Sequence, residues 1–211
     1  MFIPIGGDNL LRRLIQLLLG TTAFGIGIGL MLQSGFGLPP WDVLHEGLTE
    51  RFGLSVGKWS ILISFVVIAI WLPMKERLGI GTLVNAVVIG VMIDVTASVV
   101  PEAQILWLQV VMMALGVLAI GVGSGMYIGA NLGPGPRDGL MTAIARRGPS
   151  IRLTRTVMEG TVLIVGWILG GTVGVGTVAF ALLMGPIVQF FLPRWTVDTG
   201  NPEDSWNHPA N

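Results

Sequence analysis

Two acidic side chains interrupt long apolar stretches of this 211-residue chain and could carry proton chemistry. Asp94 and Glu159 are acidic residues inside segments that otherwise have the composition of membrane spans. A carboxylate at the centre of a membrane costs about 2.5–3.5 kcal/mol, so its presence there suggests a role in proton-coupled transport. The alternative is structural. Arg155 stands one helical turn before Glu159 and could pair with it, and Asp94 lies near the end of its span, close to water.

Two similar motifs gather further polar and helix-starting residues. GLPPWD covers residues 37–42 and GPGPRD covers residues 133–138. Proline and aspartate are typical of the first turn of a helix, so each motif predicts the start of one. We therefore place Asp42 and Asp138 on a candidate substrate path. The residues that mark the entry into the two helices are Gly37, Pro40, Trp41, Gly133 and Pro136.

Arg137 stands in the second motif where the first motif has Trp41, and it begins a basic cluster over residues 137–155. One hypothesis is an anion site, because an arginine would stand beside the exposed amides of a helix start. The alternative is anchoring of a cytoplasmic loop to anionic lipid. Asn85 and Gln189 are amides within predicted spans that could contact a substrate, although hydrogen bonds between helices are the commoner role.

The chain offers little to an enzyme or to a metal ion. It has no cysteine and two histidines, His45 and His208, neither of which lies in a predicted span. This leaves no catalytic dyad and no metal-ligand spacing, so we expect no catalytic residues, no metal and no cofactor. The formal net charge of zero gives no reason to expect nucleic acid as a partner.

Composition places these residues in a membrane protein. The chain is 52% hydrophobic and 11% charged, whereas soluble domains average about 25% charged residues. A helix of about 20 apolar residues crosses the hydrocarbon layer of about 30 Å. Reading between charges and turn signals predicts spans at residues 12–33, 56–73, 79–100, 104–130, 154–171 and 174–192.

The sequence also repeats itself. Residues 25–95 align with residues 121–190, including both Gly-Pro-Asp motifs and the later GIGT and GVGT segments. Three spans per repeat would invert the second copy relative to the first, as in many secondary transporters, which bind substrate near the membrane midplane. A short helix follows the first span of each copy, over about 41–52 and 138–147. Each is too short to cross and is either interfacial or re-entrant.

At these motifs the chain resembles a known family. The runs GLMLQSGFGLPPWDVLHEGL, SVGKWSIL and YIGANLGPGPRDGLMTAIARR resemble the YczE-like family of bacterial integral membrane proteins, which is related to the YitT group. The resemblance covers about residues 20–192 and implies a multi-pass protein of largely uncharacterised function. Members are often encoded beside regulators similar to pyridoxal-phosphate sensors, which attaches transport of an anionic metabolite, such as a vitamin B6 form, to the family as a guess.

Basic residues predict the orientation. Only Arg51 and Lys58 fall on one side of a six-span chain, and the other ten of the 12 basic residues share the side of both termini. Basic loops stay cytoplasmic, so both termini should face the cytoplasm of the bacterial plasma membrane. The ten are Arg12, Arg13, Lys75, Arg77, Arg137, Arg146, Arg147, Arg152, Arg155 and Arg194.

We therefore predict an all-α integral membrane protein with six transmembrane helices in two inverted repeats of three, each with a short helix. Residues 1–195 form one membrane domain, and residues 196–211 form a polar, disordered cytoplasmic tail. The expected function is small-molecule secondary transport, with a non-transporting scaffold or accessory protein as the alternative. Expected partners are the lipid bilayer, a small-molecule substrate and a second copy of the chain. The glycine faces that a second copy could use are Gly121, Gly125 and Gly129, and Gly166, Gly170 and Gly174.

Overall fold

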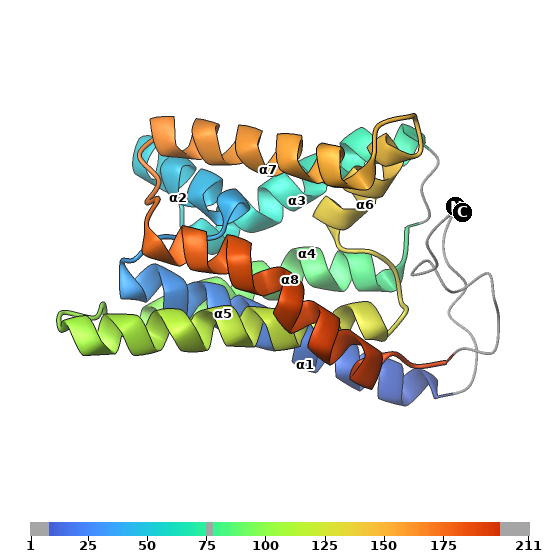
Figure 1. The fold of residues 1–211 in the computed structure, drawn as a ribbon, viewed down its shortest axis with the longest axis horizontal. Helices are drawn as coiled ribbons and strands as arrows, with labels where there is room; N and C mark the ends of the chain where they lie inside the picture. The colour runs from blue at the N-terminus through green and yellow to red at the C-terminus, as the bar shows by residue number, and fades with distance from the viewer. Residues whose placement is uncertain (1–8, 75–77, 199–211) are drawn as a thin grey trace.

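Helices form the regular elements of the computed structural model, which describes residues 9–74 and 78–198 (Figure 1). The predicted all-α class is confirmed for these residues, and each predicted span and short helix corresponds to one observed helix. The helices are α1 (Leu10–Ser34), α2 (Pro40–Phe52), α3 (Val56–Trp71), the 3-10 turn η1 (Leu72–Met74), α4 (Ile80–Val99), α5 (Leu106–Gly129), α6 (Pro136–Ala145), α7 (Ile151–Ile168) and α8 (Val175–Trp195).

Four helices of the described residues, α1, α4, α5 and α8, are long and apolar enough by themselves to cross a membrane. A fifth crossing is possible if α2 and α3, which meet at an angle of 114°, count as one broken span. Alone, α3 has 16 residues, and α7 carries Arg152, Arg155 and Glu159 within its first half. Length and composition therefore account for four or five of the six predicted spans.

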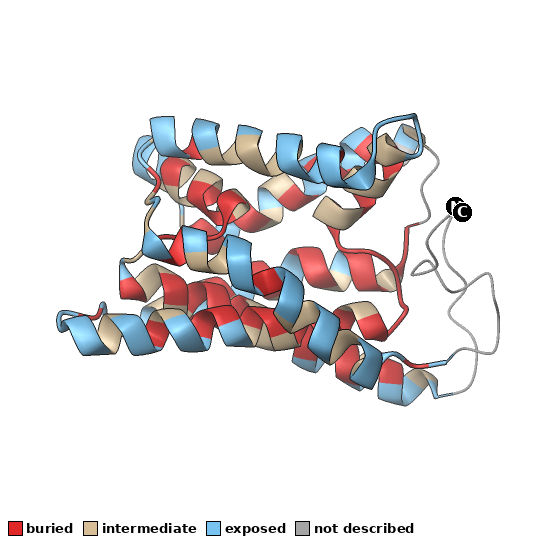
Figure 2. Ribbon diagram, in the orientation of Figure 1, coloured by how far each residue is buried: buried red, intermediate tan, exposed pale blue. Residues whose placement is uncertain are grey.

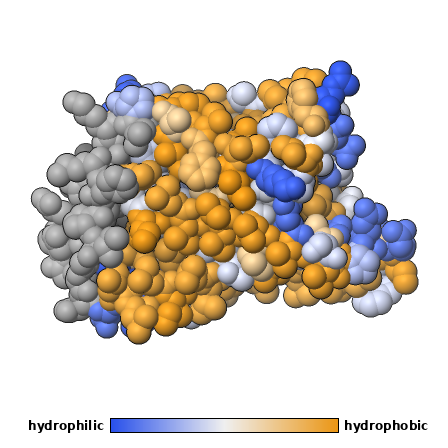
Figure 3. All heavy atoms as spheres, turned by 180° about the vertical axis from the view of Figure 1, so that it is seen from behind, coloured by the Kyte–Doolittle hydropathy of each residue, from blue (hydrophilic) through white to orange (hydrophobic). Residues whose placement is uncertain are grey.

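The outer surface of the bundle is suited to lipid. Large apolar side chains are exposed on the outward faces of the helices, among them Trp167, Ile168 and Leu182, which are 66%, 75% and 69% exposed (Figure 2). The face opposite to that of Figure 1 is also largely hydrophobic, with hydrophilic residues gathered towards its ends (Figure 3). A continuous apolar surface of this extent indicates contact with the acyl chains of a bilayer.

The helices form two layers. Helices α2, α3, α6 and α7 make one layer, and α1, α4, α5 and α8 make the other (Figure 1). Within the second layer α1 packs along α5, and a Cβ atom at Gly27 would overlap the backbone of Gly116. Glycine at such crossings lets two helix backbones approach closely, which explains part of the high glycine content. The two layers are joined chiefly where α3 packs against α4.

The predicted glycine faces are filled within the chain. A Cβ atom at Gly121 would meet Ile187 of α8, and one at Gly125 would meet Phe191 of the same helix. On the predicted face of α7, Gly166 lies directly against the backbone of α2. Most of these glycines therefore serve intramolecular packing, whereas Gly170 is exposed.

Each half of the chain has the same order of a long helix, a short helix and two further helices, and the halves exchange contacts. The turn before α2 places Gly37 against Gly174 at the start of α8, and the turn before α6 places Gly133 against Gly79 at the start of α4. Both turns need glycine, because φ is 104° at Gly37 and 121° at Gly133. Helix α2 then packs on α7, and α6 packs on α3. Each short helix thus lies against the opposite half.

The structure divides the basic residues that predict the orientation into two groups. Arg13 is buried and donates hydrogen bonds to backbone carbonyls at the end of α5, and Arg137 and Arg155 line a cavity inside the protein. Lys75 and Arg77 lie outside the described residues. The remaining members of the ten are at one end of the bundle, where α1 begins and α8 ends (Figure 1).

The predicted tail begins later than expected. The side chain of Gln16 donates a hydrogen bond to the carbonyl of Trp195 (2.7 Å), which ties the start of α1 to the end of α8. Val197 is buried, and its N–H donates to the carbonyl of Gly129 (2.9 Å). The membrane domain therefore extends past residue 195, and the rest of the predicted tail, 199–211, lies outside the described residues.

Candidate functional site

A cavity of about 290 Å³ lies between the two layers, and all eight α-helices contribute to its wall. Its size is near the lower end of the roughly 300–1,000 Å³ that is usual for small-molecule sites. Eight of the twelve predicted site residues line it: Pro40, Trp41, Asn85, Pro136, Arg137, Asp138, Glu159 and Gln189. The structure therefore brings together residues from both halves of the chain.

Both short helices begin at this cavity. An extended residue precedes each of them, Pro39 before α2 and Gly135 before α6, and a proline occupies the first helical position. The first turn of a helix leaves several N–H groups without an intrahelical acceptor and carries a partial positive charge. Asp42 and Asp138 occupy the same place in the first turns of α2 and α6, where a carboxylate is stabilised by that charge.

The start of α2 is enclosed by protein. Asp42, Val43 and His45 are fully buried, whereas Phe52 at the other end of the helix is 65% exposed. An interfacial amphipathic helix would present its polar side chains to water, and α2 instead turns Asp42 and His45 inward. The N-terminal end of α2 is therefore inside the bundle, and its C-terminal end is at the surface.

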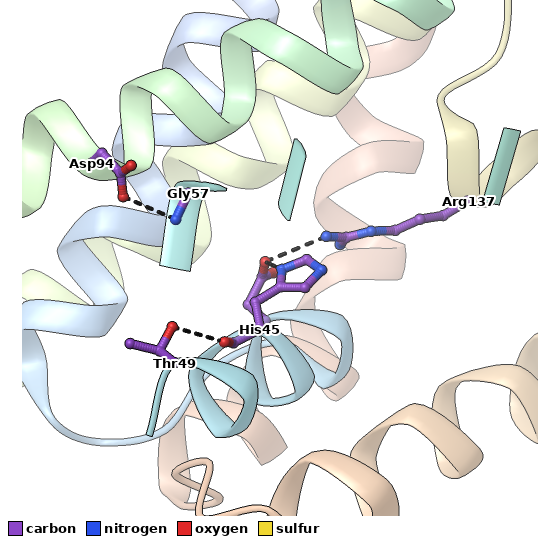
Figure 4. Close-up of polar contacts among 6 residues, drawn as sticks. His45, Thr49, Gly57, Asp94 and Arg137 are labelled. Atoms are coloured by element: carbon purple, nitrogen blue, oxygen red, sulfur yellow. Dashed lines mark hydrogen bonds and ion pairs between the residues drawn. The ribbon is translucent and has the colours of Figure 1, made fainter. Parts of the chain in front are cut away.

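Asp42 is the centre of a buried group that connects the two short helices. Its Oδ1 atom lies 3.0 Å from Nδ1 of His45, one turn further along α2, and 3.3 Å from Nη2 of Arg137, which reaches across from α6 (Figure 4). The Oδ2 atom of Asp42 and the Nε2 atom of His45 have no hydrogen-bond partner among the described residues. The guanidinium of Arg137 also lies over the ring of Trp41, 5.2 Å from its centroid.

Asp138, the counterpart of Asp42, has a different environment. It lines the cavity and accepts a hydrogen bond from the hydroxyl of Tyr127 on α5, at 2.7 Å from Oδ2. It makes no ion pair with any described residue within 4.0 Å. The two aspartates are thus equivalent in the motif, yet one is buried against an arginine and the other faces the cavity.

Glu159 and Arg155 form the pair that their spacing predicts. Arg155 Nε lies 2.9 Å from Glu159 Oε1, and both residues line the cavity. The side chain of Arg155 is 53% exposed, so this pair contributes at most about 1 kcal/mol to stability. Glu159 therefore forms the ion pair with Arg155 that the structural interpretation predicts. It also lines the cavity, where it is available to a ligand.

Asp94 is not among the residues that line this cavity. Its carboxylate accepts a hydrogen bond from the hydroxyl of Ser55 at 2.5 Å and another from the N–H of Gly57 at 2.9 Å, the second of which is drawn in Figure 4. These contacts satisfy donors at the start of α3 and hold it against α4. Gly37 and Gly133 are also absent from the cavity wall, since they belong to the turns that precede the short helices.

Several lining residues were missed by sequence reasoning. Tyr127, Ser60, Ser64 and Ser124 contribute hydroxyl groups to the cavity from α3 and α5. Small hydroxyl side chains are common in membrane helices, where they donate hydrogen bonds to backbone carbonyls. Their presence in the sequence therefore did not indicate a binding site. Tyr127 could have been singled out, because it is the only tyrosine in the chain. The aromatic and methionine side chains on the wall are Phe24, Trp41, Phe180, Met141, Met158 and Met184.

The residues present can bind a small polar or charged molecule. The cavity offers hydroxyl and amide groups, two arginines, two carboxylates and an aromatic wall, which together suit recognition of a solute with both polar and apolar parts. Among the described residues there is no group of three or more histidine, aspartate or glutamate side chains that could hold a metal ion.

Comparison with known proteins places the chain in a family. The family model described as "Family of unknown function (DUF6198)" matches residues 11–193. The chain belongs to this family. It is 38% identical over 178 residues to the "Uncharacterized membrane protein YczE" of Bacillus subtilis, an alignment that covers 83% of each chain, which confirms the YczE-like resemblance.

Two further relatives have no described activity. An "Uncharacterized protein" of Haemophilus influenzae is 41% identical over 177 residues, which are 83% of this chain and 81% of the relative. The "Uncharacterized protein YyaS" of Bacillus subtilis is 31% identical over 182 residues, covering 83% of this chain and 90% of the relative. No solved structure matches the chain.

Proposed function

We propose that this protein is a small-molecule secondary transporter of the bacterial plasma membrane. In this proposal α1, α3, α4, α5, α7 and α8 cross the membrane as two inverted sets of three, and α2 and α6 are re-entrant half-helices. The observation that carries it is the meeting of both short-helix N-termini at one cavity between the halves. Inverted-repeat transporters bind their substrates in this kind of place, at the ends of broken or short helices near the midplane.

The arrangement of the connections supports the inverted topology. The connection from α2 to α3 and the connection from α6 to α7 lie at opposite ends of the bundle (Figure 1). The first of these ends has Arg51 and Lys58, and the second has Arg146 and Arg147. By the positive-inside rule the second end faces the cytoplasm, with both termini on that side.

The two halves differ in a way that suits alternating access. Helices α3 and α4 are in close contact where Gly57 meets Gly90 and where Asp94 binds the start of α3. The repeat alignment places α7 and α8 in the equivalent positions. There Gly185, the counterpart of Gly90, has no described atom within 4 Å of where its Cβ would lie, and the exposed Gln189 borders the cavity. Helices α3 and α4 are therefore tightly packed beside the cavity, and the equivalent pair α7 and α8 is packed more loosely.

Access from the two sides of the membrane tests this proposal. The chain has no native cysteine, so Ser64→Cys places one thiol in the cavity wall. Gln104→Cys and Pro149→Cys are matched controls at exposed positions in the connections at opposite ends. Each variant is treated with a membrane-impermeant thiol reagent in right-side-out and in inside-out vesicles.

A transporter that exchanges between two states exposes Ser64→Cys to reagent from both sides, while each control reacts from one side only. Gln104→Cys should react from the periplasmic side and Pro149→Cys from the cytoplasmic side. Reaction of Ser64→Cys from one side only would contradict exchange between two states and indicate a static cavity, as expected for a scaffold or accessory protein. Reaction of both controls from the same side would contradict the inverted topology.

A further inference from the structure

The charges around the cavity do not balance. Arg137 is paired with Asp42, and Arg155 is paired with Glu159, at 3.3 and 2.9 Å. Asp138 is the third carboxylate of this group and has no cationic partner within ion-pair distance among the described residues. With His45 neutral, the group of two arginines and three carboxylates has a net charge of about −1.

Asp138 is positioned to receive a ligand. Its Oδ2 atom accepts a hydrogen bond from the hydroxyl of Tyr127, whereas its Oδ1 atom has no hydrogen-bond partner among the described residues, and the side chain lines the cavity. The first turn of α6 stabilises the carboxylate from behind. A carboxylate held in this manner within a largely apolar cavity attracts a cation more strongly than it would in water.

The rest of the wall suits the body of an organic cation. The aromatic residues Phe24, Trp41, Tyr127 and Phe180 line the cavity together with three methionines, and Arg137 lies over the ring of Trp41. Aromatic faces attract ammonium groups through their quadrupole, and methionine adapts to ligands of different shape. An anion would find a weaker site, since a carboxylate within 3.3 Å already compensates the charge of each arginine.

We infer that the cavity binds a monovalent organic cation, a primary or substituted ammonium compound with an apolar body, and that Asp138 is its counter-ion. This inference rests on the proposed function only in taking the cavity as the substrate site. It differs from the anionic substrate suggested by the basic cluster around Arg137, because each arginine of the cavity is paired with a carboxylate.

Three probes that share a phenyl ring and a two-carbon chain test the inference: 2-phenylethylammonium, 2-phenylethanol and 3-phenylpropionate. Binding to the purified full-length protein is measured by calorimetry and by the fluorescence of tryptophan, which includes Trp41 on the cavity wall. The ammonium compound should bind at least tenfold more tightly than the alcohol, and the carboxylate should bind most weakly. Equal affinities, or tightest binding of the carboxylate, would overturn the inference without any variant being needed.

Asp138→Asn keeps the size of the side chain and its contact with Tyr127 and removes the charge. It should weaken binding of 2-phenylethylammonium at least tenfold and leave 2-phenylethanol unchanged. The matched control is Glu102→Gln, which removes a carboxylate charge from an exposed position in the connection between α4 and α5, away from the cavity, and should leave the affinity unchanged. Equal loss in both variants would overturn the role of Asp138. Binding of the cation without transport would contradict the proposed function alone, and transport of an anion would contradict the cation inference alone.

Discussion

At the scale of single residues, the contact between Asp42 and Arg137 decides how the two short helices meet. Asp42 is completely buried, and Arg137 provides its cationic partner from the other half of the chain. A buried carboxylate that loses its partner is costly, by several kcal/mol, because it keeps its desolvation penalty without the compensating attraction. The pair therefore holds α2 and α6 together beside the cavity, whose wall includes Arg137.

Arg137→Gln should lower the stability of the protein by about 3 kcal/mol, because Asp42 is left buried without a cation. The double variant Arg137→Gln with Asp42→Asn should recover most of that loss. The measurement is the unfolding midpoint of the purified proteins in the same detergent. A single variant as stable as the parent, or a double variant less stable than the single one, would contradict this account of the pair.

The sequence predicts part of this residue-level arrangement. The two motifs identify Asp42, Arg137 and Asp138 because proline and aspartate at a helix start are recognisable locally. They do not predict that Arg137 pairs with Asp42, since this contact depends on how the halves pack. The contacts of Asp94 are not predictable for a similar reason, because its partners at the start of α3 come together with it only in the folded chain.

At the scale of the elements, the boundaries of the helices follow from local signals and their packing does not. Charges and glycine or proline turns delimit apolar segments, so every helix is predicted to within a few residues. The glycine faces were correctly read as packing surfaces, but the sequence could not show that their partners lie in the same chain. Gly57 is a further example, since it is inconspicuous in sequence and lies in the tightest contact between the layers.

Gly57→Ala should destabilise the protein by about 1–3 kcal/mol, because its Cβ would overlap the backbone of Gly90 and the carboxylate of Asp94. Gly160→Ala is the matched control in α7, where no described atom lies within 4 Å of the added carbon. It should be neutral or stabilising by up to about 1 kcal/mol, because alanine favours helix over glycine. The measurement is the unfolding midpoint of each purified variant in the same detergent, compared with that of the parent protein. Equal effects would show that the contact between α3 and α4 is looser than described.

At the scale of the whole molecule, two halves with the same order of helices enclose one cavity and close it unequally. Repeated motifs made the common order of helices in the two halves predictable. The unequal packing around the cavity was not predictable, because the repeat implies symmetry and the asymmetry arises from Asp94 binding α3 while Gln189, in the equivalent place, borders the cavity. In the proposed transport cycle, this inequality belongs to one of two exchanging states.

The most direct test of transport through the cavity is a measurement of solute flux. The variant Ser64→Cys allows the open and the blocked cavity to be compared in the same protein. Proteoliposomes with this variant are loaded with a small-molecule extract of bacteria, and the solutes that leave are identified by mass spectrometry before and after the thiol is modified with a bulky maleimide. We expect at least one solute to leave the proteoliposomes faster than it leaves protein-free liposomes, and we expect modification of the thiol to stop this flux. No solute faster than in protein-free liposomes, or a flux that continues unchanged after modification, would contradict transport through this cavity.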